Sequence, residues 1–205
     1  MHYNMEIEEL IESVAHDMLN PVNNIKIAFE YEKIGQTAAA VGFYSRAAEY
    51  GYYDYPELSY NALLRISYCV ENQTGREHTL ENCLLQAIDY LPNRPEAYLL
   101  ISRFYERKGD WQEAYTFAGI GLKMANLNLE PLPISVDYAG PYTLKFQRML
   151  SSWYIGRKDE SINLLYDLAQ TKDMDEQYKA PVINNFNNLG LDRSLLSDPI
   201  SELKK

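Results

Sequence analysis

Residues 28–47 read AFEYEKIGQTAAAVGFYSRA, and this stretch decides the fold. Ala40, Tyr44 and Ala47 follow Gly35 at offsets of five, nine and twelve residues. Steps of four and three residues place these side chains on one face of a helix. Because most of them are small or apolar, we expect a helix after Gly35 that packs closely against a neighbouring helix.

The same offsets recur after three further glycines, which indicates a repeat architecture. The glycines Gly35, Gly75, Gly109 and Gly156 are spaced 40, 34 and 47 residues apart. Helix-turn-helix repeats have a period of about 34 residues, so the spacing predicts an irregular array of helix pairs. Aromatic side chains are expected to end three of the first helices: Tyr31, Tyr105, and Trp153 with Tyr154. The packed faces of the later second helices are predicted to consist of Leu80, Leu84, Ala87, Ala114, Ala118, Gly121, Ser161, Leu165 and Leu168.

We expect an all-α fold without strands, an αα-superhelix of about four helix pairs with a capping helix at each end. Helices are predicted near residues 5–19, 22–34, 37–50, 57–72, 77–91, 95–108, 111–125, 141–155, 159–170 and 178–189. Prolines support this map, because a missing amide donor is tolerated between helices and none of these prolines interrupts a predicted helix. They are Pro56, Pro92, Pro95, Pro131, Pro133 and Pro141.

One repeat domain is predicted over residues 1–190, followed by a polar tail over residues 191–205. Residues 1–20 contain an amphipathic helix that we expect to cap the array, with a dimer seam as the alternative. Residues 126–141 combine three prolines with several apolar side chains. They are therefore interpreted as an extended insertion that is pinned onto the helices.

The composition is acidic, with 29 Asp and Glu against 19 Lys and Arg, and the formal net charge of the 205 residues is −10. Such a surface repels phosphate backbones and anionic lipids, so no nucleic-acid partner and no membrane partner are expected. No apolar stretch approaches the roughly 20 residues of a membrane span. Residues 1–12 lack the pattern of a secretory signal, so we expect a cytoplasmic protein. Cys69 and Cys83 lack disulfide or zinc spacing and are expected to be buried thiols.

Several stretches resemble known repeat proteins. Residues 28–47 and 97–121 resemble tetratricopeptide repeats, which implies stacked helix pairs. Residues 91–98, LPNRPEAY, and 103–111, RFYERKGDW, are similar to the helical-repeat module that accompanies glycosyltransferases in bacterial and phage chains. The similarity continues at residues 114–122, 136–138, 153–156, 160–161, 174–176 and 184–190, and it covers residues 22–190. The resemblance implies a link to sugar chemistry by association, since a fold does not by itself define a function.

No feature of the sequence supports catalysis. A sugar-nucleotide enzyme would need alternating strands and helices with a metal-binding acidic pair, and residues 173–175, Asp-Met-Asp, precede a helix instead of following a strand. We interpret that pair as a helix-capping turn. His2, His16 and His78 lack metal-ligand spacing. We therefore predict a protein that is not an enzyme and has no catalytic residue, no metal and no cofactor.

The first helices of stacked pairs line the concave face of a solenoid, which is its usual recognition surface. The residues predicted to line it are Phe29, Asn61, Arg65, Leu99, Arg103, Arg107, Gln147 and Arg148, with Ile25 beside Phe29. Arginine offers a bidentate donor fork for carboxylates, so we hypothesise that the four arginines contact an acidic peptide segment or a partner's carboxylate. The alternative is that they pair internally with Glu71, Glu96 or Glu106. The apolar Ile25 and Phe29 do not support the carboxylate clamp of chaperone-binding tetratricopeptide domains.

Tyrosines are abundant, and most of the 18 are expected to pack between helices with their hydroxyls toward solvent. The run over residues 50–56, YGYYDYP, is dense enough to form a contact patch for a sugar or a partner chain, although packing between repeats is the favoured interpretation.

The function predicted from these observations is a non-catalytic scaffold that binds a protein or peptide partner, placed beside a glycosyltransferase or in a sugar-modifying complex. The alternative is a structural component of a larger assembly, such as a virion or multiprotein particle, that uses the repeats for self-association or docking. The two differ in whether the chain recruits a separate catalytic protein or copies of itself.

Overall fold

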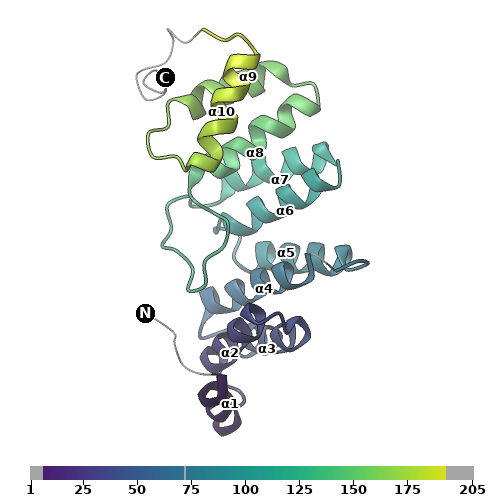
Figure 1. Ribbon diagram of the computed structural model, residues 1–205, viewed down its shortest axis with the longest axis vertical. Helices are drawn as coiled ribbons and strands as arrows, with labels where there is room; N and C mark the ends of the chain where they lie inside the picture. Colours follow the sequence, from purple (N-terminus) through teal and green to yellow (C-terminus); the bar gives the residue numbers. More distant parts are fainter. Residues whose placement is uncertain (1–6, 72, 193–205) are drawn as a thin grey trace. The chain divides into compact units, whose positions relative to one another are not determined.

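A computed structural model describes residues 7–71 and 73–192, and the described part is helical without strands (Figure 1). Its ten helices follow the predicted map to within a few residues, which confirms the all-α fold. They are α1 Ile7–His16, α2 Pro21–Lys33, α3 Thr37–Tyr50, α4 Pro56–Glu71, α5 Glu77–Tyr90, α6 Glu96–Arg107, α7 Trp111–Met124, α8 Pro141–Tyr154, α9 Lys158–Ala169 and α10 Glu176–Asn188.

The anchor glycines follow the first helices: Gly35, Gly109 and Gly156 lie two residues after the helix end, and Gly75 lies four residues after it. Gly35, Gly75, Gly109 and Gly156 have φ between 75° and 83°, a left-handed conformation that only glycine adopts without strain. At the end of α2, the Gly35 N–H donates to the carbonyl of Glu32, and the next amide donates to the carbonyl of Tyr31. This pair of bonds satisfies the last carbonyls of the helix and turns the chain into α3.

The packed faces predicted for the second helices are buried. On α3, Ala40, Tyr44 and Ala47 are fully buried, and the corresponding side chains of α5, α7 and α9 are buried as well. Each of these helices therefore contributes one apolar stripe to the core, which is how an amphipathic helix gains most of its stability. The repeat pattern identified from four glycines is confirmed at the level of individual side chains.

The chain forms two compact units. The first comprises Met1–Pro92 and Glu130–Val136, and the second comprises Asn93–Leu129 and Asp137–Lys205. In the first unit, α1 packs on α2, and α2 to α5 pack in succession; in the second, α6 to α10 do the same. The single domain expected over residues 1–190 thus contains two units, each with its own core.

The stretch between α7 and α8 has no regular secondary structure, in agreement with the expected insertion. Its central residues, Glu130–Val136, belong to the first unit, although the residues on either side belong to the second. Pro181, which is not one of the six prolines considered above, lies inside α10. It is the sixth of 13 residues, and its missing amide removes one intrahelical bond without ending the helix.

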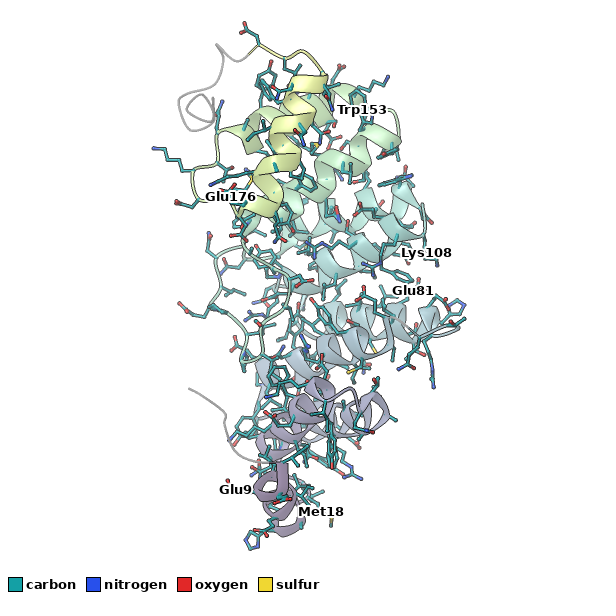
Figure 2. All side chains as sticks on the ribbon, viewed as in Figure 1. Glu9, Met18, Glu81, Lys108, Trp153 and Glu176 are labelled. Atoms are coloured by element: carbon teal, nitrogen blue, oxygen red, sulfur yellow. The ribbon has the colours of Figure 1, made fainter. Side chains whose placement is uncertain are left out.

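At the amino end of the first unit, α1 packs on α2 through Leu10, Val14 and Ile27. Met18, which follows α1, is exposed (Figure 2). The first residues of the predicted capping helix and nearly all of the predicted tail lie outside the described residues. Within the described residues, no helix is both long enough and apolar enough to span a membrane.

Candidate protein-interaction faces

The first-helix face of the first unit is formed by α2 and α4 and carries Phe29, Asn61 and Arg65. Asn61 is fully buried, and its side chain bonds to the backbone of Ile134 in both directions. The Asn61 Nδ2 donates to the Ile134 carbonyl at 3.0 Å, and the Ile134 N–H donates to the Asn61 Oδ1 at 2.8 Å. One amide side chain therefore satisfies both polar groups of an extended residue, as a neighbouring strand would.

Arg65 connects the same segment to the helices. Its Nη1 donates to the Ser135 carbonyl at 3.1 Å, and its Nε donates to Glu32 at 3.1 Å, with a second bond from Nη2 to the same carboxylate. The Tyr44 hydroxyl donates to Glu32 at 2.6 Å. Burial works against the charge of Arg65, but the bonds to Glu32 outweigh it and raise the arginine pKa. Burial and the neighbouring Glu32 raise the pKa of Tyr44, which stays neutral and acts as a donor.

An apolar cavity of about 240 Å³ lies beside these contacts. Ile25 and Phe29 of α2 line it together with Pro133 and Ile134 of the insertion. Leu132 of the same segment is buried. The first-helix face of the first unit is therefore covered by a segment of its own chain. Hydrogen bonds from helix side chains to the main chain of this segment, together with apolar contacts, hold it in place.

Asn61→Ala is expected to release this segment. The substitution leaves the partly buried N–H and C=O of Ile134 without their partner, and an unsatisfied buried polar group costs about 1 to 3 kcal/mol. We expect the free energy of unfolding of the first unit to fall by about 2 kcal/mol and the Ile134 amide to exchange with solvent faster. Hydrogen exchange measured by mass spectrometry tests this. The exposed Asn82→Ala on α5 is the control, and equal exchange in both variants would contradict the assignment.

The second unit places the remaining predicted residues on α6 and α8. Arg103 forms an ion pair with Asp137 at 3.5 Å and a hydrogen bond to the Tyr178 hydroxyl. Gln147 is buried and donates to Glu106 at 2.7 Å. Arg107 is exposed at the end of α6, whereas Leu99 is fully buried and belongs to the core instead of an accessible face.

Arg148 is held by α7 and α9. Its Nε donates to Glu160 at 2.7 Å, its Nη1 donates to the Tyr115 carbonyl at 2.9 Å, and its guanidinium lies 3.2 Å from the centroid of the Tyr115 ring. The Tyr115 hydroxyl donates to Glu160 at 2.8 Å. Burial acts to raise the pKa of Glu160, but the bonds from Tyr115 and Arg148 outweigh it and lower that pKa. Arg148 thus ties three helices together.

Internal pairing, the alternative considered for the arginines, is present, and the charges of Arg103 and Arg107 act to lower the pKa of Glu106, one of the expected partners. Arg65 pairs with Glu32, Arg103 with Asp137 and Arg148 with Glu160. Of the expected partners, Glu106 bonds to Gln147 and Glu96 pairs with Arg94. An anionic partner would have to compete with these pairs.

Glu106 gives the second unit a pH dependence that can be measured. Burial raises its pKa above the ordinary 4.5, against the lowering effect of Arg103 and Arg107. A raised carboxyl pKa means that its stabilising contribution is complete below about 4.5 and is lost as pH rises through the folded-state pKa. We therefore expect Glu106→Gln to be more stable than the wild type near neutral pH, with a difference that vanishes in acid. Urea unfolding across pH tests this, with the exposed Asp167→Asn as control; a pH-independent difference would contradict it.

The LPNRPEAY stretch contains a buried ion pair. Arg94 and Glu96 have side-chain exposures of 2% and 6%, and Nη2 and Nε of Arg94 donate to the two carboxylate oxygens at 2.6 and 3.2 Å. The charged residues of this motif therefore interact with each other inside the second unit. Their role in the structure is to orient the start of α6, since a bidentate pair fixes both side chains.

The tyrosine-rich turn between α3 and α4 is exposed. Tyr53 has 89% of its surface accessible, and Tyr50, Tyr52 and Tyr55 are also exposed. Tyr52 makes a ring contact with the next helix pair, at 4.5 Å between its centroid and that of Tyr90 on α5. The favoured interpretation, packing between repeats, thus fits Tyr52, whereas Tyr53 offers an open aromatic surface. This difference has no signal in the sequence, because exposure depends on which helices lie next to the turn.

The sequence also predicts structural roles for the two cysteines and for the acidic pair before α10. Cys69 and Cys83 are free thiols, but the prediction that they are buried is wrong, because both are only partly buried. Partial burial raises the pKa of both, that of Cys69 to about 12. Asp175 is the residue before α10, but its side chain makes no capping bond. Within residues 7–71 and 73–192, no group of three or more His, Cys, Asp or Glu side chains is placed to hold a metal ion.

Comparisons with known proteins define the class of fold. No family model matches the chain, and no curated protein matches it. Solved structures match its fold. MamA is 14% identical with a TM-score of 0.61, over 85% of this chain and 89% of that chain. YrrB, described as a TPR protein with an unusual peptide-binding site, is 10% identical with a TM-score of 0.61, over 93% and 89%. TTC0263, a TPR protein of Thermus thermophilus, is 12% identical with a TM-score of 0.54, over 88% and 89%.

The fold is therefore that of tetratricopeptide-like helical repeats, as the resemblance implied. At these identities the likeness concerns the fold alone. The predicted link to a glycosyltransferase stays a prediction.

Proposed function

We propose that this chain is a non-catalytic protein-interaction module that binds an extended segment of a partner through its first-helix faces. One observation carries the proposal: the side chains of Asn61 and Arg65 form hydrogen bonds with main-chain groups of residues 134 and 135. Because these bonds involve no side chain of the bound segment, another extended segment can make the same ones. Specificity would then come from the apolar cavity beside Phe29.

The partner that we propose is a glycosyltransferase or another component of a sugar-modifying complex in the cytoplasm. The support for it is the resemblance of residues 91–122 to repeat modules that accompany such enzymes. In the second unit, the accessible part of the proposed surface comprises Arg103 and Arg107 on α6, whereas Arg148 bonds to the second helices α7 and α9. Arg103 is already paired with Asp137, so a contact there would extend this pair to a partner carboxylate.

The test uses two variants that both free the insertion and have opposite expected effects on binding. Ile134→Ser removes an apolar anchor of the insertion and leaves Asn61 in place, so the face opens with its binding residue intact. Asn61→Ala opens the face and removes that residue. Tagged full-length proteins, shown to be folded by circular dichroism, are used to capture partners from native lysate, with chemical crosslinking to map the contact.

A glycosyltransferase crosslinked near α2 or α4, enriched by Ile134→Ser and depleted by Asn61→Ala, is the expected result. The same capture by Asn61→Ala as by the wild type would contradict the proposal. Recovery of copies of this chain alone would also contradict it.

Self-association in a larger assembly is a second candidate, and exposed apolar side chains support it. Ile11 on α1 is exposed, and Met18 and Leu19 directly after that helix are each 62% exposed. Clustered exposed apolar side chains mark interaction surfaces in soluble proteins. Sedimentation velocity of the wild type against Met18→Ser/Leu19→Ser tests this candidate. A concentration-dependent dimer that the double variant abolishes is expected from it, and a monomer in both proteins would exclude it.

A further inference from the structure

A second groove in the first unit is lined by α3, α4 and α5. It has a volume of about 650 Å³, within the range of roughly 300 to 1,000 Å³ found for ligand pockets. Val41 and Ala48 of α3, with Leu63 and Ile66 of α4, form its apolar part. Polar side chains of α5 and three tyrosines, Tyr52, Tyr53 and Tyr90, line the rest. We call this the tyrosine groove.

The tyrosine groove carries negative charge without a cation. Glu49 and Asp89 line it and are exposed, and the lining includes neither lysine nor arginine. The sequence from residue 47 to residue 64 also contains no basic residue. Neither Glu49 nor Asp89 forms an ion pair with any residue that the structure describes.

Both acidic residues are placed against the helix dipoles. Glu49 lies in the last turn of α3 and Asp89 in the last turn of α5, and neither last turn contains a basic residue. The carboxyl end of a helix carries partial negative charge, which favours cations there and disfavours carboxylates. The charges at this end of the groove are thus unfavourable in the isolated chain. A bound cation would relieve the unfavourable interaction at both helix ends.

The tyrosines offer ring faces to such a cation. Tyr53 is almost completely exposed, its ring centroid lies 5.0 Å from that of Tyr52, and Tyr52 in turn packs on Tyr90. A guanidinium or ammonium group is attracted to the face of an aromatic ring, most strongly beside a carboxylate. The chain uses this arrangement internally, where the Arg65 guanidinium lies 4.6 Å from the Tyr68 centroid.

We infer that the tyrosine groove binds an extended segment of a partner protein that presents an arginine or lysine beside an apolar side chain. The cation contacts Tyr52 and Tyr53 and pairs with Glu49 and Asp89, and the apolar side chain contacts Leu63 and Ile66. The inference rests on the proposed function in that the ligand is a protein. It concerns a different face, however. The tyrosine groove is expected to recognise a cationic side chain, whereas the first-helix face is proposed to bind the backbone of a partner segment.

The test begins with a phage library of random linear peptides selected on the immobilised full-length chain. The expected result is enrichment of peptides with arginine or lysine next to a leucine, isoleucine, valine or proline. The best peptide is synthesised and titrated calorimetrically against wild type and variants. The groove residues to be substituted are exposed, so the variants are expected to fold.

Glu49→Gln/Asp89→Asn is expected to weaken peptide binding about tenfold or more, because charge-assisted hydrogen bonds are lost. Tyr53→Ala is expected to weaken it about threefold through loss of the cation–ring contact. Added salt should weaken binding to the wild type and have less effect on the double variant. Asp167→Asn on α9 is the matched control and should bind as the wild type does.

Glu49→Lys separates the proposal from a general loss of structure. It places a cation at the carboxyl end of α3, so we expect a higher unfolding temperature together with loss of peptide binding. Enrichment of acidic or uncharged peptides would overturn the inference, and so would a failure to enrich any peptide. Binding that survives Glu49→Gln/Asp89→Asn unchanged would overturn it as well. Asn61→Ala should leave this binding intact, so failure of the first-helix face can be distinguished from failure of the tyrosine groove.

Discussion

Gly121→Ala is expected to destabilise the second unit by about 2 kcal/mol, although alanine is the better helix former. A Cβ atom at this position of α7 would lie 2.6 Å from the Cβ of Tyr98 and 3.2 Å from a methyl carbon of Leu144. Both neighbours are buried, and the Tyr98 Cβ is bonded directly to the α6 backbone, so it cannot move without displacing that helix. The close approach of three helices at Gly121 is therefore a requirement of this unit.

Gly42→Ala is the matched control and has the opposite expected sign. Gly42 is also inside a helix, α3, but apart from its chain neighbours and the backbone of α3 no atom lies within 4 Å of the position where its Cβ would be. Alanine there should stabilise the first unit by about 0.5 to 1 kcal/mol, because it restricts the unfolded chain and favours helix. Urea unfolding followed by circular dichroism compares the two variants. If Gly121→Ala stabilised the protein as Gly42→Ala is expected to, the neighbours of Gly121 would have to move to accommodate the new Cβ atom.

Arg65→Ala is expected to lower the stability of the first unit by about 3 kcal/mol. Side-chain exposures of 13% for Arg65 and 19% for Glu32 mean that removal of the arginine leaves a largely buried carboxylate without its cation. Breaking a buried pair costs about 3 to 5 kcal/mol, and the partial exposure of this pair favours the lower end. The substitution also removes the donor to Ser135 and so weakens the hold on the insertion.

The double variant Arg65→Met/Glu32→Gln distinguishes a lost ion pair from lost packing. It removes both charges and keeps most of the side-chain volume, and Tyr44 can still donate to the amide oxygen. We expect it to be more stable than Arg65→Ala, because no buried charge stays uncompensated. Arg46→Ala, an exposed arginine on α3, should change stability by less than about 0.5 kcal/mol in urea unfolding. An equal loss of stability in Arg65→Ala and in Arg65→Met/Glu32→Gln would show that the uncompensated charge is not the cause of the destabilisation.

The helices and their packed faces could be predicted because the information is local. A glycine at the end of a first helix fixes a turn, and offsets of five, nine and twelve residues from it define a helical face. Gly109 with Ala114, Ala118 and Gly121 is one example in which all of these features are found in the structure. Neither a turn nor a face requires knowledge of distant residues.

The contacts of the candidate site could not be predicted in the same way. The partners of Asn61 and Arg65 are 73 and 33 residues away, and each arginine could choose among 29 acidic residues. Arg103 and Arg148 lie on α6 and α8, but their partners do not follow from the repeat pattern, because Asp137 lies in the insertion and Glu160 on α9. The exposure of Tyr53 likewise depends on the helices around its turn.

The assignment of Glu130–Val136 to the first unit has a consequence for biosynthesis. Proteins are made from the amino end, so α6 and α7 leave the ribosome before the segment that covers α2 and α4 does. Until then Asn61 and Arg65 are without their backbone partners from residues 134 and 135. The nascent first unit therefore passes through a stage with an open face, in which a chaperone or a partner protein can bind before the chain's own segment competes for the same hydrogen bonds.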